Sequence, residues 1–325
     1  MKSVPRLIEN ISKRLFLFLL ILGLPAGILV SCSQPAGLEP APESSTAPIT
    51  IKDGLNRQIQ LPGPAERVVS LAPALTEILF AIGAGDQVVG RDSFSDYPIE
   101  AKSIPDIGGG FGDLNLELIL AQKPDLVLAS ELTPIEQIKS LQDLGIIVFA
   151  LPNPVDFPGL FEGIQTIASL TGREVQAKTI IEALEARVQK IVAENGRIET
   201  RPLIFYEIDG TDPNAPWTPG PGSFVHMLIQ EAGGDNLGAR LDSEWAQISI
   251  EEIIAQDPDI ILLGDATWGG VTPEDVRLRP GWDALKAVQN GSLFIFDDNL
   301  VSRPGPRLVD GLEGLARLFH PEVFQ

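Results

Sequence analysis

The chain has 325 residues, of which 44% are hydrophobic and 21% are charged, so it is long enough to bury two hydrophobic cores. Acidic residues outnumber basic residues by 44 to 24, which gives a formal net charge of −20. Because nucleic acids are bound through a surplus of Lys and Arg, this balance argues against a nucleic-acid partner. One cysteine and two histidines exclude an intramolecular disulfide, a cysteine-based zinc site and a His-rich metal site.

The N-terminus has the pattern of a secretory signal peptide over residues 1–31, with basic residues followed by an apolar run at 15–30. The run is short for a membrane span. Its last residues, Leu29-Val30-Ser31, precede Cys32 and resemble a bacterial lipobox. That resemblance implies cleavage before Cys32 and a lipid anchor on its thiol. The alternative is an uncleaved anchor helix with an unmodified cysteine.

Residues 32–48 predict a flexible tether. The stretch SQPAGLEPAPESSTAP at 33–48 contains four prolines and almost no bulky apolar side chains, so it cannot contribute to a core. We therefore expect a folded part that is tied to the outer face of a membrane.

Strands and helices alternate after the tether. Residues 49–61 predict a hairpin around Asp53-Gly54. The next predicted elements are a strand at 67–71, helices at 76–82 and 116–121, a strand at 125–129, a helix at 134–144 and a strand at 146–150. This rhythm is typical of βαβ units with a mostly parallel sheet.

One long helix divides the folded part. Residues 173–195 contain no Gly or Pro and repeat apolar residues at helical spacing. The α/β rhythm then restarts with strands at 203–206, 260–263 and 293–296 and a final helix at 307–318. We predict an N-terminal lobe at 49–172, a connecting helix at 173–195 and a C-terminal lobe at 196–325.

An internal repeat indicates that the two lobes have related folds. Residues 115–128 (NLELILAQKPDLVL) and 249–262 (SIEEIIAQDPDIIL) align without a gap, and seven of the fourteen positions are identical. The predicted fold class is therefore α/β: two Rossmann-like lobes with mostly parallel sheets, joined by one long α-helix. Ligands of such proteins bind between the lobes, near the carboxyl ends of the strands.

The sequence lacks the common enzyme signatures. It contains no GxxxxGK[ST], GxSxG or HExxH motif. The glycine run at 108–112 fails the GxGxxG pattern because Asp113 stands where the third glycine should be. We expect binding rather than catalysis, with no catalytic residues and no metal site.

Aromatic residues stand in segments rich in glycine and proline, which we expect to be loops. They are Phe94, Tyr97, Phe111, Trp217 and Trp245. Rings on loops beside a cleft suit a large, flat ligand with amide groups at its edge. The alternative is that the rings only cap the core of each lobe.

Glu117 and Glu251 occupy equivalent positions of the repeat, two residues after Asn115 and Ser249. Both preceding residues are good N-caps, so each carboxylate is expected in a first helical turn, where the helix dipole stabilises it. That is a sufficient structural reason for both. A second interpretation is that one carboxylate on each lobe docks onto basic pockets of a two-fold symmetric partner.

Five segments together resemble the periplasmic cobalamin-binding proteins, which are class III, helical-backbone solute-binding proteins of ABC importers. They are RVVSLAPALTEILFAIG (67–83), VVGRDSFSDYP (88–98), NLELILAQKPDLVLAS (115–130), WAQISIEEIIAQDPDIILLG (245–264) and SRPGPRLVDGLEGLARLFHPE (302–322). The resemblance covers residues 49–325. It implies a monomer that carries cobalamin or a related corrinoid as its transported ligand, with no other cofactor, to a permease dimer with ATPase subunits.

The resemblance also implies roles for individual residues. It places Pro73 and Ala74 on a loop that touches the corrin, with Tyr97 nearby. Trp217 and Trp245 match aromatic contacts of the second lobe, and Glu117 and Glu251 match the permease-docking pair. The remaining ligand contacts are Phe111, where the family often has tryptophan, Asn299, where some members have an acidic residue, and Arg303. In the family the long helix limits lobe motion.

Two other interpretations remain at this point. In the first, the same fold binds a ferric siderophore or haem instead of a corrinoid. A ferric siderophore would need arginines facing an anionic chelate, which Arg91, Arg303 and Arg307 could supply. Haem would need an axial ligand such as Tyr97, Tyr206 or His226. The other interpretation is an enzyme, since two Rossmann-like lobes also build chelatases and glycosyltransferases.

Overall fold

The structure is a computed structural model that describes residues 47–110 and 112–324. The predicted signal peptide, Cys32, most of the predicted tether and Phe111 lie outside the described residues. None of the helices in these two ranges is both long enough and apolar enough to cross a membrane.

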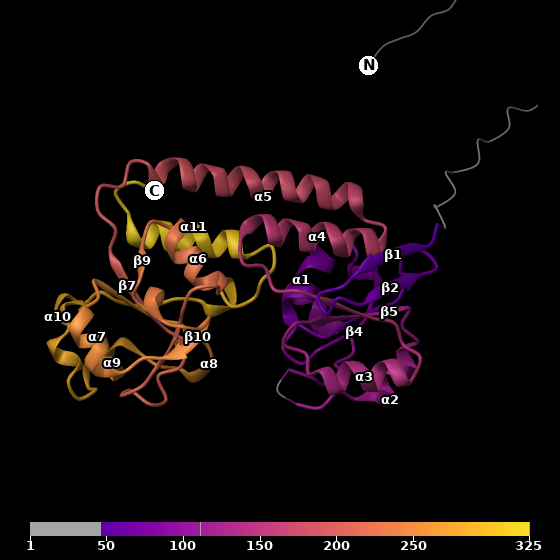
Figure 1. Cartoon of the computed structure of the whole chain (residues 1–325), viewed down its shortest axis with the longest axis horizontal. Helices are drawn as coiled ribbons and strands as arrows, with labels where there is room; N and C mark the ends of the chain where they lie inside the picture. The colour runs from indigo at the N-terminus through magenta and orange to yellow at the C-terminus, as the bar shows by residue number, and fades with distance from the viewer. Residues whose placement is uncertain (1–46, 111, 325) are drawn as a thin grey trace, which may run out of the picture. The chain divides into compact units, whose positions relative to one another are not determined.

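The N-terminal lobe contains a parallel sheet with helices on both faces (Figure 1). Its strand order is β4-β3-β5-β6. The strands are β3 (Val68–Ser70), β4 (Val88–Arg91), β5 (Leu126–Ser130) and β6 (Val148–Leu151), and an antiparallel hairpin of β1 (Ile49–Lys52) and β2 (Gln58–Leu61) precedes them. The helices are α1 (Pro73–Ala81), α2 (Leu116–Gln122), α3 (Ile135–Asp143) and α4 (Phe157–Thr171).

Alternate residues of these strands enter two different cores. Leu126 and Leu128 of β5 pack on the side of α1 and α4, whereas Val127 packs with Ile119 of α2 and Ile138 of α3. Because both faces of the sheet are covered, the strands are apolar along nearly their whole length rather than alternating with polar residues.

The C-terminal lobe repeats this arrangement with the strand order β12-β11-β7-β9. The strands are β7 (Leu203–Glu207), β9 (Asp235–Asn236), β11 (Ile260–Leu263) and β12 (Leu293–Ile295), with a separate pair of β8 (Trp217–Pro219) and β10 (Trp245–Gln247). The helices are α6 (Phe224–Glu231), α7 (Ile250–Gln256), α8 (Ala266–Gly269), α9 (Pro273–Arg277), α10 (Lys286–Asn290) and α11 (Leu308–Phe319). Short 3-10 helices occur at Gly85–Gln87, Ile99–Ser103, Leu237–Arg240, Trp282–Ala284 and Asp298–Leu300.

Helix α5 (Glu174–Asn195) connects the lobes and lies along α4 and α11 (Figure 1). Its buried residues, among them Leu184 and Val188, belong to one apolar cluster that includes residues of both lobes. Arg187 on the same helix donates to Asp310 Oδ1 (2.6 Å) and Glu313 Oε1 (2.9 Å) of α11. The connecting helix therefore covers a core that continues from one lobe into the other.

The sequence repeat is a structural repeat of one helix and the strand that follows it. Asn115 Oδ1 accepts a hydrogen bond from the Leu118 N–H (2.9 Å), and Ser249 Oγ accepts one from the Glu252 N–H (3.2 Å). Each helix ends on a non-glycine residue in the left-handed region, Lys123 and Asp257, both at a φ of 50°. The predicted N-caps of α2 and α7 are therefore confirmed.

The repeated aspartates tie each unit to its sheet. Asp125 Oδ2 accepts from the Arg67 N–H (2.9 Å) just before β3, and Asp259 Oδ2 accepts from the Leu203 N–H (2.7 Å) at the start of β7. The identity of these residues in both copies thus reflects one shared local hydrogen-bond pattern.

The predicted fold class is confirmed, with three local corrections. Trp217 and Trp245 lie in strands β8 and β10, not on loops, because their backbones pair with each other's strand despite neighbouring prolines and glycines. Pro73 and Ala74 form the first turn of α1 rather than a loop, since proline is well suited to that position. The hairpin turn is longer than Asp53-Gly54 alone predicts, with Asn56 at a φ of 63°.

Adjacent isoleucines of the repeat unit provide a test of this packing. Ile253 is fully buried, whereas Ile254 is 39% exposed. We expect Ile253→Ala to lower the free energy of unfolding by about 2–5 kcal/mol because it leaves a cavity. The matched Ile254→Ala variant should change it by less than about 1 kcal/mol. Urea unfolding followed by circular dichroism measures both; equal effects would contradict the described core.

Candidate functional site

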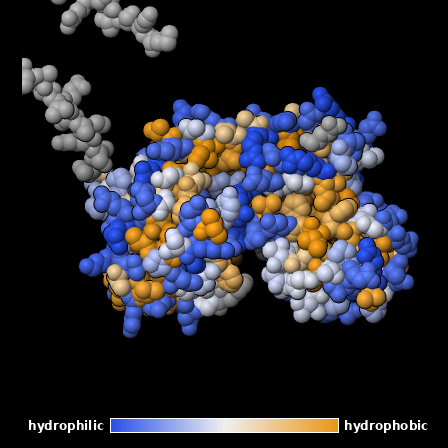
Figure 2. Space-filling view, turned by 180° about the vertical axis from the view of Figure 1, so that it is seen from behind, coloured by the Kyte–Doolittle hydropathy of each residue, from blue (hydrophilic) through white to orange (hydrophobic). Residues whose placement is uncertain are grey.

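The loops that follow the strands of both sheets meet around a hollow between the lobes. Figure 2 shows the surface hollowed at this boundary. In the N-terminal lobe the relevant segment is 92–98, after β4, and in the C-terminal lobe it is 297–307, between β12 and α11. Carboxyl ends of parallel strands are the usual place for ligand sites in α/β folds.

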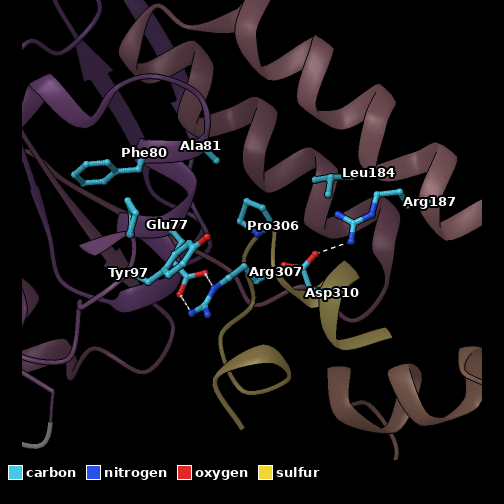
Figure 3. Close-up of a pocket in the computed structure, with 10 residues that line it drawn as sticks. Glu77, Phe80, Ala81, Tyr97, Leu184, Arg187, Pro306, Arg307 and Asp310 are labelled. Carbon is cyan, nitrogen blue, oxygen red and sulfur yellow. Dashed lines mark hydrogen bonds and ion pairs between the residues drawn. The ribbon is translucent and has the colours of Figure 1, made fainter. Parts of the chain in front are cut away.

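A buried carboxylate of α1 joins these segments. Glu77 is almost completely buried. Its Oε2 accepts from Arg307 Nε (2.8 Å) and its Oε1 from Arg307 Nη2 (2.5 Å), as Figure 3 shows. Arg303 Nη1 lies 3.5 Å from Glu77 Oε1 and 2.7 Å from Asp96 Oδ1. Burial alone would raise the pKa of Asp96, but the hydrogen bond and the charge of Arg303 hold it below its ordinary value.

Tyr97 lies next to this ion-pair cluster. Its side chain is 47% exposed, and the guanidinium carbon of Arg307 lies 4.0 Å from the ring centroid. A cation over the face of an aromatic ring is attracted by the ring quadrupole. One face of Tyr97 is therefore occupied by a side chain that comes from the other lobe.

The segment that carries Tyr97 is held by a buried polar network. Asp92 accepts from the Phe94 N–H (3.1 Å) and from the Ser95 hydroxyl. Ser95 Oγ lies 2.8 Å from Thr76 Oγ1 of α1. Burial raises the pKa of Asp92 even though these hydrogen bonds oppose the shift. The network fixes the start of segment 92–98 against the same helix that carries Glu77.

A cavity of about 380 Å³ adjoins the cluster on the side of the connecting helix (Figure 3). Its lining includes Glu77, Phe80, Tyr97, Leu184, Arg187 and Arg307. These residues come from α1, from segment 92–98, from α5 and from the start of α11. The cavity therefore lies where both lobes and the connecting helix meet.

Trp217 and Trp245 present their rings on one face of the β8–β10 pair. Trp245 pairs with Pro219 and Gln247 pairs with Trp217, so the two tryptophans are diagonal neighbours on the same face. They are 41% and 37% exposed. The Trp245 ring also packs edge-on against Phe224 of α6 at a centroid distance of 5.7 Å. Figure 1 places β10 on the side of its lobe that faces the other lobe.

The remaining predicted contacts occupy less open positions. Ala74 is buried, and Gly305 of the opposite lobe lies against it, where an added Cβ would come within 3.4 Å of the Ala74 carbonyl oxygen. Asn299 donates from Nδ2 to Asp297 Oδ1 (2.9 Å) in the segment that leads to Arg303. The predicted contacts thus include exposed rings as well as buried or hydrogen-bonded residues of the lobe junction.

Glu117 and Glu251 are both exposed in the first turns of α2 and α7. They lie on different lobes, outside the cluster around Glu77. Their position is that expected from the repeat.

The side chains named for the alternative ligands are largely committed to internal contacts. Arg91 donates to the carbonyl oxygens of Ala101 (3.1 Å) and Asp92 (2.8 Å). Tyr206 is fully buried and donates to Asp298 Oδ1 (2.6 Å), and burial raises the pKa of its phenol. His226 Nδ1 lies 3.0 Å from Asn236 Nδ2. Of these alternatives, Tyr97 is the most exposed.

A second buried charge cluster supports the loop that leads to Trp217. Arg279 forms a two-point ion pair with Glu207 (2.6 and 2.8 Å) at the end of β7. Asp265, also buried, accepts from the Gly210 N–H (2.9 Å). Burial raises the pKa of Glu207 to about 7, and the nearby Asp265 adds to the shift.

Glu77 and Trp268 are further site candidates that the sequence did not single out. Glu77 is the one charged residue of the mostly apolar helix segment PALTEILFA, and a buried charge needs a partner. The sequence therefore indicates that Glu77 needs a partner, but it does not indicate which residues the partners are. Trp268 is exposed on α8, directly after β11, and GDATWGG gives no pattern that distinguishes it from a surface ring.

Comparisons with known proteins add independent information. A family model described as periplasmic binding protein matches residues 68–300. The chain is 30% identical over 310 residues to an uncharacterised ABC transporter substrate-binding lipoprotein of Bacillus subtilis strain 168, covering 93% of this chain and 96% of that protein. It is 30% identical over 307 residues to a cobalamin-binding protein of Halobacterium salinarum strain R1, covering 91% and 80% respectively.

Solved structures are also similar to this chain. The apo form of a periplasmic haem-binding protein from Roseiflexus sp. RS-1 is similar with a TM-score of 0.70 and 28% sequence identity. The similarity covers 80% of this chain and 100% of that chain.

Proposed function

Because the chain belongs to the periplasmic binding protein family, we propose that it captures cobalamin or a related corrinoid between its two lobes and delivers it to an ABC import permease. The similarity to a cobalamin-binding protein supports the ligand, and the similarity to a substrate-binding lipoprotein supports the transport role. The proposal is capture and delivery without chemical change of the ligand.

The choice of a corrinoid rests on two features together: exposed aromatic rings, and arginines whose charges are already paired with carboxylates. Tyr97, Trp217 and Trp245 expose aromatic surface, which suits a broad apolar ligand. Arg303 and Arg307 are paired with Glu77 and Asp96, so they offer little free positive charge to an anionic chelate. A large macrocycle with amide side chains fits this lining better than a ferric siderophore with a strong negative charge.

Haem is the second candidate. The similarity to a periplasmic haem-binding protein and the exposed phenol of Tyr97 favour it, since a tyrosine oxygen is an axial ligand of haem iron in some proteins. In this structure the face of the Tyr97 ring is covered by Arg307. Direct comparison of the two ligands decides between them.

Removal of both tryptophan rings tests the proposed binding surface. We expect Trp217→Ala with Trp245→Ala to weaken cobalamin binding by about 30-fold or more, because buried aromatic contacts dominate such interfaces. Phe294→Ala is the matched control, since Phe294 is 39% exposed on the outer strand β12. Isothermal titration gives the affinities. A double variant that binds cobalamin as tightly as the control would remove the β8–β10 face from the site.

We also propose that Glu117 and Glu251 dock the protein onto the permease. Reversing both charges, Glu117→Lys with Glu251→Lys, should abolish uptake of cobalamin by cells and leave its binding constant unchanged. The control reverses two other exposed first-turn carboxylates, Glu136→Lys with Glu252→Lys. Equal loss of uptake in both double variants would point to net charge instead of specific docking.

A lipid anchor at Cys32, after removal of residues 1–31, remains a proposal for the localisation of the protein outside the cytoplasm. Similarity to a lipoprotein supports it. We expect Cys32→Ser to move the protein from the membrane fraction to the soluble extracytoplasmic fraction, measured by detergent phase partition and immunoblotting. Retention of the variant in the membrane would refute the anchor.

A further inference from the structure

We propose that Glu77 is the positioning residue of the binding cleft. Through Arg307 it holds the ring of Tyr97 in one orientation, and through Arg303 it holds the neighbouring segment of the opposite lobe. The inference deepens the proposed function and relies on it for the identity of the ligand.

Glu77 can act in this way because its charge cannot remain buried alone. It lies in the middle of the apolar helix α1 and is almost completely buried. An isolated buried carboxylate is strongly unfavourable, so the arginines must stay beside it. Both come from segment 303–307, more than 220 positions away in the sequence.

The two arginines then act on consecutive residues of segment 92–98. Arg303 donates to Asp96 Oδ1 at 2.7 Å, and Arg307 covers the ring of Tyr97 at 4.0 Å. Figure 3 shows the side chains of Glu77, Arg307 and Tyr97 close together beside the cavity. The position of Tyr97 is therefore determined by a carboxylate that Tyr97 itself does not need to touch.

The geometry of Arg307 makes this link directional. Its guanidinium donates from Nε and Nη2 to the two oxygens of Glu77, and such a two-point pair fixes the plane of the guanidinium as well as its position. The plane in turn fixes the surface on which the tyrosine ring rests. A single-point ion pair would leave that plane free to rotate.

The simpler interpretation is that the cluster only holds the lobes together. A second ion pair fastens the C-terminal lobe to the connecting helix, because Arg187 of α5 is paired with Asp310 and Glu313 of α11. Glu313 is paired with Arg187 and Arg317, neither of which is a predicted ligand contact. Its loss therefore provides a matched control for loss of a carboxylate at the junction of the lobes.

The first test is Glu77→Gln in the full-length chain, with cyanocobalamin as the ligand and stopped-flow binding as the measurement. Each loosened side chain that must be ordered on binding reduces the affinity by about 2- to 10-fold. With Tyr97 and the two arginines released, we expect the association rate constant to fall about 10-fold or more, because the competent arrangement is populated for only part of the time. The dissociation rate constant should change little. Glu313→Gln should leave both rate constants unchanged.

The second test does not depend on any ligand. The chain has two tyrosines, and Tyr206 is fully buried, so incorporation of 3-fluorotyrosine gives two ¹⁹F signals to compare. We expect Glu77→Gln to shift or broaden the signal of Tyr97 and to leave that of Tyr206 in place. Tyr97→Phe assigns the signals. Arg307→Lys, which retains the charge but loses the two-point pair, should have the same effect and serves if Glu77→Gln does not fold.

The outcomes separate this inference from the proposed function. If the wild-type chain does not bind cyanocobalamin but the Tyr97 signal moves in Glu77→Gln, the ligand assignment fails and the positioning role holds. If the wild type binds and Glu77→Gln associates at the same rate, the positioning role is wrong. An unchanged Tyr97 signal in both Glu77→Gln and Arg307→Lys would likewise overturn it.

Discussion

The burial of the Glu77 carboxylate is the constraint around which the junction of the two lobes is arranged. A charge at that depth requires a cation, and the N-terminal lobe supplies none within hydrogen-bonding distance among its described residues. The segment between β12 and α11 must therefore approach α1 closely enough for Arg303 and Arg307 to reach it. That approach also brings Gly305 against Ala74 and Arg307 over Tyr97. The apolar core beneath α5 and the pair formed by Arg187 and Asp310 act in the same direction from the connecting helix.

Most of the fold could be predicted from local patterns in the sequence. The repeat at 115–128 and 249–262 predicted two related lobes because each copy contains a complete helix with its N-cap, its left-handed end and an aspartate that binds the neighbouring strand. The absence of Gly and Pro at 173–195 was sufficient to predict the connecting helix, which the structure has at Glu174–Asn195. The sequence does not predict helix α4, because Pro158 and the glycines at 159 and 163 weaken its helical pattern. Packing of α4 against the sheet and against α5 compensates for this weakness.

The candidate site was less accessible from the sequence because its contacts are not local. The partners of Glu77 lie 226 and 230 positions away, and no periodicity links them. Trp217 and Trp245 were assigned to loops from neighbouring glycines and prolines, but backbone pairing between their strands overrides that preference. The roles of Pro73, Tyr97, Trp217, Trp245, Asn299 and Arg303 as ligand contacts remain predictions. What the structure adds is that the arginines are already paired and that the rings are exposed, which is the physical basis for preferring a neutral macrocycle.

The proposed corrinoid ligand is tested most directly by isothermal titration of the full-length chain with cyanocobalamin, with haemin and a ferric tris-catecholate as comparators. Tight one-to-one binding of cyanocobalamin is expected, with no comparable heat from either iron compound, because both are anionic and the arginines that would attract them are held by Glu77 and Asp96. Binding of haemin or the ferric tris-catecholate without binding of cyanocobalamin would contradict the proposed ligand and would assign the cleft to an iron compound.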